Sequence, residues 1–193
     1  TSAQNVIYTV TPTSTGGSCA DIAQTIQVTV NPKPAMTSAS TATICSGGTA
    51  TIPFTSNVAS TYTWIATDNT NTTGESLTTQ STATLSNTIT NNTTSAQNVI
   101  YTVTPTSSGG SCAGTAQTIT VTVNPTPAMT STNTATVCGG NAVSISFTSN
   151  VASTYTWIAT DNPNTTGESL TTQSTSTLNN TITNTTTTTQ NVI

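Results

Sequence analysis

The chain has almost no charge. Charged residues make up 3% of its 193 positions, and Lys33 is the one basic residue, because Arg and His are absent. Binding to nucleic acid or to an anionic membrane surface needs clustered Lys or Arg. The sequence also contains no run of about 20 apolar residues that could cross a bilayer. We therefore expect no nucleic-acid partner and no membrane insertion.

The absence of His removes most of the usual catalytic sets. Ser-His-Asp and Cys-His nucleophiles cannot be built from these residues. The four cysteines cannot supply a four-ligand zinc site within one repeat, because each repeat contains two of them and no His. We expect no enzyme and no cofactor.

Leu is scarce, whereas Thr, Ser, Asn, Ala and Val dominate. Thr and Val favour strands, because branching at Cβ restricts χ1 in a helix. Segments such as residues 99–103 alternate apolar and polar side chains, which argues for a packed core rather than disorder. The composition predicts an all-β chain.

The sequence repeats itself. Residues 1–10 return unchanged at 94–103, which is 93 positions later, and residues 187–193 begin a third copy. Roughly four in five positions of residues 1–93 are identical in residues 94–186. A catalytic site needs to be built once, whereas a shaft needs length, so close repeats favour a structural role.

Proline marks the joints between repeats. The runs Asn31-Pro32-Lys33-Pro34 and Asn124-Pro125-Thr126-Pro127 follow strong strands and cannot continue a central ladder, since Pro lacks the N–H donor. We therefore expect three parts: residues 1–31 as the C-terminal strands of a preceding repeat, 32–124 as a complete repeat, and 125–193 as the N-terminal part of the next. This frame predicts a stretch cut from a longer array.

The complete repeat carries seven strand signals at the short spacing of an immunoglobulin-like sandwich. They are residues 35–43, 50–55, 62–65, 76–80, 83–90, 99–104 and 119–123. Aromatic residues at fixed places are interpreted as core, with a sugar-stacking Trp as the alternative. The core candidates are Phe54, Trp64, Tyr101, Phe147 and Trp157.

The order of motifs resembles a known family. Tyr101-Thr-Val-Thr-Pro-Thr is followed by Gly-Gly-Ser-Cys112-Ala-Gly, then by Thr-Ile-Thr-Val-Thr-Val-Asn124-Pro-Thr-Pro, then by Thr136-Val-Cys138-Gly-Gly. This pattern resembles the PKD-like, immunoglobulin-like repeats of giant secreted Bacteroidota surface proteins. The resemblance implies tandem seven-stranded sandwiches in a gliding adhesin or surface filament that is exported by the type IX pathway.

Two cysteines per repeat suit an oxidising, extracellular setting, and we interpret Cys19, Cys45, Cys112 and Cys138 as disulfide residues. The pairing is open. In an ordinary sandwich the corners that carry Cys45 and Cys112 lie at opposite ends, which favours a bridge between neighbouring domains. A bridge between Cys45 and Cys112 within one domain is the alternative, and it would require a short or displaced first strand.

Each repeat has one acidic loop. It runs from Asp68 to Glu75 and returns from Asp161 to Glu168. Carboxylates and amides are calcium ligands, so these four acidic residues are weak calcium candidates. The Asn residues do not fall at the alternating places of an EF-type loop, so an ordinary turn is the preferred interpretation and no metal is predicted.

Together these features predict a secreted structural segment at the cell surface. It would serve as the shaft of a filament or adhesin, spacing and attaching mechanically, with copies of itself as partners and with another cell's surface or glycans as possible targets. Low charge would allow lateral bundling. Two alternatives remain: a glycan- or ice-binding module that uses outward Thr118, Thr120 and Thr122, and a polymer in which residues 125–193 borrow residues 1–31 of another molecule.

Overall fold

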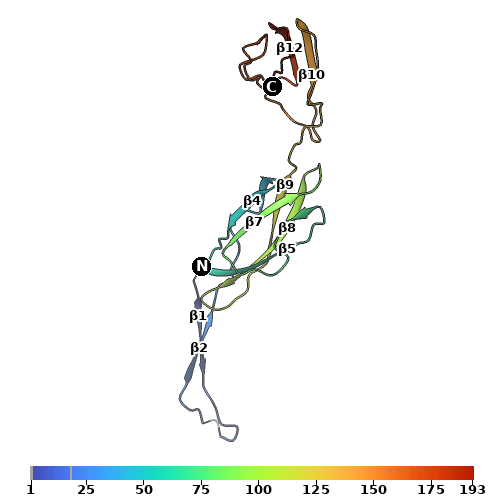
Figure 1. Cartoon of the computed structure of the whole chain (residues 1–193). Helices are drawn as coiled ribbons and strands as arrows, with labels where there is room; N and C mark the ends of the chain where they lie inside the picture. Colours follow the sequence, from blue (N-terminus) through green and yellow to red (C-terminus); the bar gives the residue numbers. More distant parts are fainter. Residues whose placement is uncertain (1, 18) are drawn as a thin grey trace. The chain divides into compact units, whose positions relative to one another are not determined.

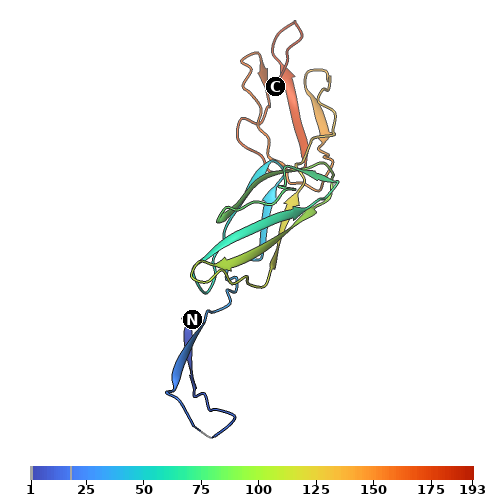
Figure 2. The ribbon, with the colours of Figure 1, turned by 90° about the horizontal axis from the view of Figure 1, so that it is seen from below.

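The computed structural model describes residues 2–17 and 19–193 and is all-β, as the composition predicted. The chain divides into two compact units, Thr1–Asn124 and Pro125–Ile193, each considered by itself below (Figures 1 and 2). No helix of the described residues is long and apolar enough to cross a membrane.

The first unit begins with a β-hairpin. Strands β1 (Gln4–Val10) and β2 (Gln24–Val30) pair antiparallel in a two-stranded sheet of their own, with Tyr8 opposite Ile26. Every described side chain of both strands is exposed. The hairpin is therefore a pair of strands without a core (Figure 1).

The rest of the first unit is a sandwich of seven strands. These are β3 (Thr41–Cys45), β4 (Gly48–Pro53), β5 (Ser60–Thr67), β6 (Thr72–Thr73), β7 (Thr84–Asn91), β8 (Gln97–Ser107) and β9 (Gln117–Asn124). One sheet has the order β3-β9-β8-β5 and the other the order β4-β7-β6, and β3 runs parallel to β9. The expected seven-stranded, two-sheet class is confirmed.

Strict alternation along the strands builds the core. On β8 and β9 every second side chain faces the other sheet, and the inward residues have no exposed surface. The opposite sheet contributes Leu85 and Ile89 from β7, which are also fully buried. The inward residues of β8 and β9 are Val99, Tyr101, Val103, Ile119, Val121 and Val123.

Two of the seven strand predictions were wrong in position. The first strand begins at Thr41 rather than near residue 35, because Met36 forms only an isolated bridge to Ser56 across the entry segment. Residues 76–80 contain no strand, only a bridge from Gln80 to Trp64. The fourth strand of the sandwich is instead β6, two residues long, within the loop that was interpreted as an ordinary turn.

The second unit forms one three-stranded sheet, with β10 (Asn141–Ser146), β11 (Thr165–Thr166) and β12 (Thr177–Asn184) in the order β10-β12-β11. This order reproduces the β4-β7-β6 sheet of the first unit, shifted by one repeat. Residues 153–160 have the same sequence as β5 but form no strand and keep only the bridge from Trp157 to Gln173. The described residues of this unit contain no named strand that corresponds to β8 or β9.

Candidate functional site

The aromatic residues of the complete sandwich form one buried cluster. Trp64 is 4% exposed and Phe54 is 6% exposed, and their rings meet edge to face at 6.2 Å. The indole Nε1 of Trp64 donates to Thr82 Oγ1 at 3.1 Å. A ring held in this way cannot stack on a sugar at the surface.

In the second unit the equivalent aromatic residues are only half-buried. Phe147 and Trp157 were expected in a core, and their rings lie at the same 6.2 Å, but both keep intermediate exposure. In the first unit β8 and β9 lie across the cluster, and Tyr101 of β8 touches Trp64. The difference therefore follows from β8 and β9, which have no counterpart among the described residues of the second unit, and not from the aromatic residues themselves.

Tyr101 links the two sheets through its hydroxyl. The ring is fully buried and the hydroxyl donates to Asn87 Oδ1 on β7 at 2.9 Å. Burial, and secondly the negative charge of Glu75, raise the pKa of Tyr101 well above its usual value. The phenol therefore stays neutral and acts as a structural donor.

Asn91 is a structural residue that the sequence analysis missed. It is 7% exposed, and its Nδ2 donates to the carbonyl oxygens of Val123 and Ser95, each at 2.8 Å. Its Oδ1 accepts from the backbone N–H of Thr93. The available signal was its return at Asn184 in the same sequence context.

The acidic loop is held by its own hydrogen bonds. The Thr72 hydroxyl lies 2.8 Å from Glu75 Oε1, and Asn69 Oδ1 accepts from the backbone N–H of Asn71. Gly74 has φ +99°, and a Cβ there would overlap the carbonyl oxygen of Thr88 on β7. The loop therefore closes tightly onto β7.

The equivalent loop of the second unit repeats this arrangement. The Thr165 hydroxyl lies 2.8 Å from Glu168 Oε1, and the backbone N–H of Glu168 and then this hydroxyl hold the pKa of the Glu168 carboxyl below its usual value. The other carboxylate oxygens, Glu75 Oε2 and Glu168 Oε2, are buried without a hydrogen-bond partner. Within residues 2–17 and 19–193, no three His, Cys, Asp or Glu side chains gather as a metal site, and neither Asp68 nor Asp161 joins one.

The cysteines of one domain lie at its two ends. Cys45 ends β3 opposite Asn124, the last residue of β9. Cys112 lies in the β8–β9 turn. Its carbonyl oxygen accepts a hydrogen bond from the backbone N–H of Ser107, the last residue of β8. Strand β8 spans about 35 Å between these ends at roughly 3.3 Å per residue, whereas the Cα atoms of a disulfide lie within about 7 Å.

The alternative of a Cys45–Cys112 bridge within one domain is therefore wrong for this fold. All four cysteines are unpaired in the structure. Cys19 is the equivalent of Cys112 and lies between β1 and β2. Cys138 is the equivalent of Cys45, since it lies three residues before β10 as Cys45 lies three residues before β4.

The ends that carry the cysteines also carry the linkers. Gly110, in the β8–β9 turn, lies so close to Asn31 that a Cβ would overlap its side chain, and Gly114 lies equally close to the carbonyl of Pro34. The chain therefore enters the sandwich beside the β8–β9 turn. It leaves after Asn124, at the opposite end of β9.

The outward face of the four-stranded sheet is rich in Thr. In the strand register, Thr118 is opposite Thr102, Thr120 is opposite Thr41 and Thr122 is opposite Thr43. Thr118 is exposed, and Thr120 and Thr122 are half-buried. This face offers hydroxyl groups without charge.

The PKD-like domain family matches residues 1–34, 42–127 and 135–193. No curated protein matches the sequence. PKD-like domains are non-catalytic modules that are typically extracellular and serve at cell surfaces and in adhesion. Since the matched segments span nearly the whole chain and include all of the complete sandwich's strand residues except Thr41, the chain belongs to the PKD-like domain family.

Proposed function

We propose that the chain is a structural segment of a long extracellular filament or adhesin shaft, in which each PKD-like domain adds a fixed length. One observation carries this proposal: the chain enters the complete sandwich at one end and leaves it at the other. Repeats connected in this way extend a molecule instead of folding it back. The setting we propose is the surface of a Bacteroidota cell, reached by type IX export.

The joints between domains would limit bending. Pro occurs twice in each linker, which removes backbone N–H donors and fixes φ. The cysteines at the two ends of a domain support a bridge between the exit end of one domain and the entry end of the next. Such a bridge would hold neighbouring domains in one orientation under load.

The outward Thr face would allow shafts to lie side by side. Its hydroxyl groups are uncharged, and the whole sequence carries a formal net charge of −4. Weak repulsion between copies favours lateral packing. Copies of the same chain are therefore the proposed lateral partners, with another cell's surface or its glycans as the attachment target.

The shaft proposal is tested by measuring length. A chain with one additional copy of residues 32–124 inserted after Asn124 is compared with the parent chain by small-angle X-ray scattering at high dilution. We expect the maximum dimension to grow by about 35 Å, the length of the eleven-residue strand β8, with an unchanged cross-section. An unchanged maximum dimension would contradict the shaft.

A further inference from the structure

The outward face of the four-stranded sheet has an apolar centre. Ile65 on β5 is 37% exposed and Ile100 on β8 is 43% exposed, and each stands between inward residues of its strand. Ile65 is opposite Thr102, and Ile100 is opposite Thr67. The two isoleucines are therefore diagonal neighbours, close enough for their side chains to form one apolar patch.

Threonine surrounds this patch. It occupies most other outward positions of the two strands: Thr61, Thr63 and Thr67 on β5, and Thr102, Thr104 and Thr106 on β8. None of the four strands of this sheet contains a charged residue, and their aromatic residues all point inward. The outward side chains of β3, β9, β8 and β5 together form the Thr face.

The outer face of the other sheet has no such centre. Its strands are also uncharged, but outward positions on β4 and β7 carry Thr, Ser and Pro, and no large hydrophobic residue is exposed there. The hydroxyl groups of Thr49 and Thr88 lie 2.7 Å apart on this face. The complete sandwich therefore has two uncharged outer faces, and only the Thr face carries exposed Ile.

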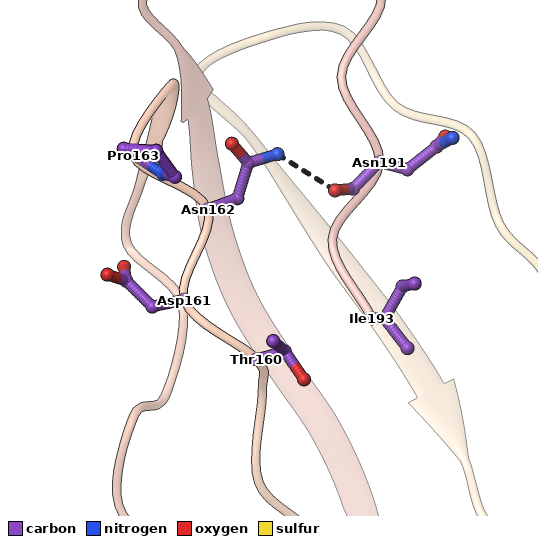
Figure 3. Close-up of a pocket in the computed structure, with 6 residues that line it drawn as sticks. All are labelled: Thr160, Asp161, Asn162, Pro163, Asn191 and Ile193. Carbon is purple, nitrogen blue, oxygen red and sulfur yellow. Dashed lines mark hydrogen bonds between the residues drawn. The ribbon is translucent and has the colours of Figure 1, made fainter.

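The same two isoleucines recur in the second unit. Ile158 and Ile193 stand one repeat after the first pair and are 57% and 87% exposed. The segment that carries Ile193 is held beside residues 160–162. Asn162 Nδ2 donates to the Asn191 carbonyl oxygen at 2.9 Å (Figure 3), and the N–H of Thr160 donates to the Ile193 carbonyl oxygen at 2.6 Å. The apolar pair is thus a feature of the repeat.

The chemistry of the Thr face limits the partners that it can bind. A charged partner would lose its hydration at a surface that offers no counter-charge. The face also presents no aromatic ring on which a sugar could stack. A second Thr face fits better, because its apolar patch can cover the first one. Each Thr hydroxyl is both a donor and an acceptor, so hydroxyl groups that face each other can form hydrogen bonds.

We propose that two copies of this chain associate laterally through their Thr faces, with Ile65 and Ile100 of one copy packed against the same residues of the other. The contact is isologous, because the same surface serves in both copies. Two sheets that face each other in this way align their strands within about 30°. This inference rests on the lateral packing proposed above and adds the face and the residues that produce it.

The size of the face sets the strength of the contact. Four strands about 4.8 Å apart, each about eight residues long, cover about 500 Å². Two such faces would bury about 1,000 Å², which is near the lower limit for a specific interface. One pair of domains should therefore associate weakly. Several domains in one chain bind together, so lateral association should strengthen steeply with the number of repeats.

Two charged variants separate the two outer faces. Ile100→Asp places a charge in the apolar centre of the Thr face, and Ser86→Asp places the same charge on the outer face of the other sheet. Both residues are exposed and lie outside the core, so thermal unfolding of the complete sandwich serves as the folding control. In every chain the four cysteines are replaced by Ser, so that disulfides cannot join the copies.

Sedimentation velocity over a concentration series measures the association. We expect the parent chain and Ser86→Asp to dimerise at high concentration, and Ile100→Asp to need a concentration about 100-fold higher, because a charge would be buried without a partner. A chain with one additional copy of residues 32–124 after Asn124 should associate at concentrations about 10-fold lower than the parent. A parent chain that stays monomeric, an Ile100→Asp chain that associates as the parent does, or an extended chain that associates no more tightly overturns the proposal.

Alkylation by iodoacetamide maps the contact. In the chain without native cysteines, Thr118→Cys places one thiol on the Thr face and Ser86→Cys places one on the other outer face. The thiolate sulfur bonds to the methylene carbon of the reagent and iodide leaves. We expect alkylation of Thr118→Cys to slow when the chain is concentrated, whereas that of Ser86→Cys should not change. Equal slowing at both positions, or none at Thr118→Cys, would contradict a contact between two Thr faces.

This test and the length test of the shaft can fail separately. Length is measured at high dilution, where the Thr faces are free, and association is measured at high concentration. A chain that lengthens with an added repeat but never associates would remove the lateral contact and leave the shaft. A chain that associates but does not lengthen would remove the shaft and leave the contact.

Discussion

Tyr101 is a residue at which stability and pH are coupled. Its ring is fully buried, its hydroxyl donates to Asn87, and its pKa is raised by burial and by the charge of Glu75. A tyrosine whose folded pKa exceeds its unfolded value of about 10 contributes stability that is complete below that pH. This contribution is lost as the pH rises toward the folded pKa.

We expect Tyr101→Phe to lower the free energy of unfolding by about 1 kcal/mol at neutral pH, because one buried hydrogen bond is removed. Above pH 10 the parent chain should lose stability faster than the variant, so the gap between them narrows. Urea unfolding of both chains between pH 7 and pH 11 measures this difference. Parallel curves over that range would show that the Tyr101 hydroxyl does not titrate with unfolding.

Gly74 is the residue at which the acidic loop depends on the absence of a side chain. Its φ of +99° and the nearby Thr88 carbonyl leave no room for Cβ. Gly74→Ala should therefore destabilise the complete sandwich by about 2 kcal/mol or more, since the strain and the overlap add. Gly109→Ala is the matched control, because a Cβ at Gly109 meets nothing within 4 Å.

Chemical denaturation of the two glycine variants separates these effects. Gly109→Ala should stay within about 0.5 kcal/mol of the parent chain. An equal decrease in the free energy of unfolding for both variants would mean that the loop does not close tightly onto β7 through Gly74.

At the scale of the element, one sequence occurs here in two states. Residues 54–69 and 147–162 are identical, yet 60–67 is strand β5 and 153–160 is not a strand. The alternation of residues 62–65 predicted this strand in both copies. The alternation could not predict that 153–160 forms no strand, because a strand also needs a neighbouring strand to pair with. Among the described residues, only 60–67 has such a neighbour, in β8.

Other elements show what sequence patterns miss. β8 and β9 were predicted in the right places because their alternation is strict, although the predicted 99–104 and 119–123 are shorter than the strands themselves. β6 was missed because two residues are too short for a periodic signal, and its place on β7 depends on Gly74 and Asn91. The ends that carry Cys45 and Cys112 were anticipated from sandwich topology, whereas the half-exposed Trp157 was not.

Hydrogen exchange tests the role of the missing partner strand. Residues 57–73 and 150–166 are compared as peptides, because Thr70 and Pro163 give the two otherwise matching segments different masses. At high dilution, backbone amides of 60–67 should exchange at least 100-fold more slowly than those of 153–160, since only the former are paired with β8. Equal protection at high dilution would mean that 153–160 finds a partner within its own chain.

At the scale of the whole molecule, the main property is that the chain enters each sandwich at one end and leaves it at the other. Each complete sandwich has an entry end beside the β8–β9 turn and an exit end after Asn124. Cys112 marks the entry end and Cys45 marks the exit end. When such domains follow one another head to tail, each joint brings together the exit cysteine of one domain and the entry cysteine of the next. The two cysteines of the same domain lie too far apart to form a disulfide.

This rule predicts the disulfide that two consecutive domains form. In the chain that carries an additional copy of residues 32–124 after Asn124, Cys45 of the first copy lies at an exit end and Cys112 of the inserted copy lies at the entry end that follows. Oxidation with oxidised glutathione should therefore join these two residues, with release of two molecules of reduced glutathione. Peptide mapping without reduction identifies the pair.

Two variants make the disulfide prediction decisive. Cys112→Ser in the inserted copy should abolish the pair and leave Cys45 of the first copy reactive toward iodoacetamide. Cys112→Ser in the first copy should leave the pair intact, because that residue lies at the far end of its own domain. A Cys45–Cys112 pair within one domain would contradict the fold itself, since β8 holds these residues about 35 Å apart.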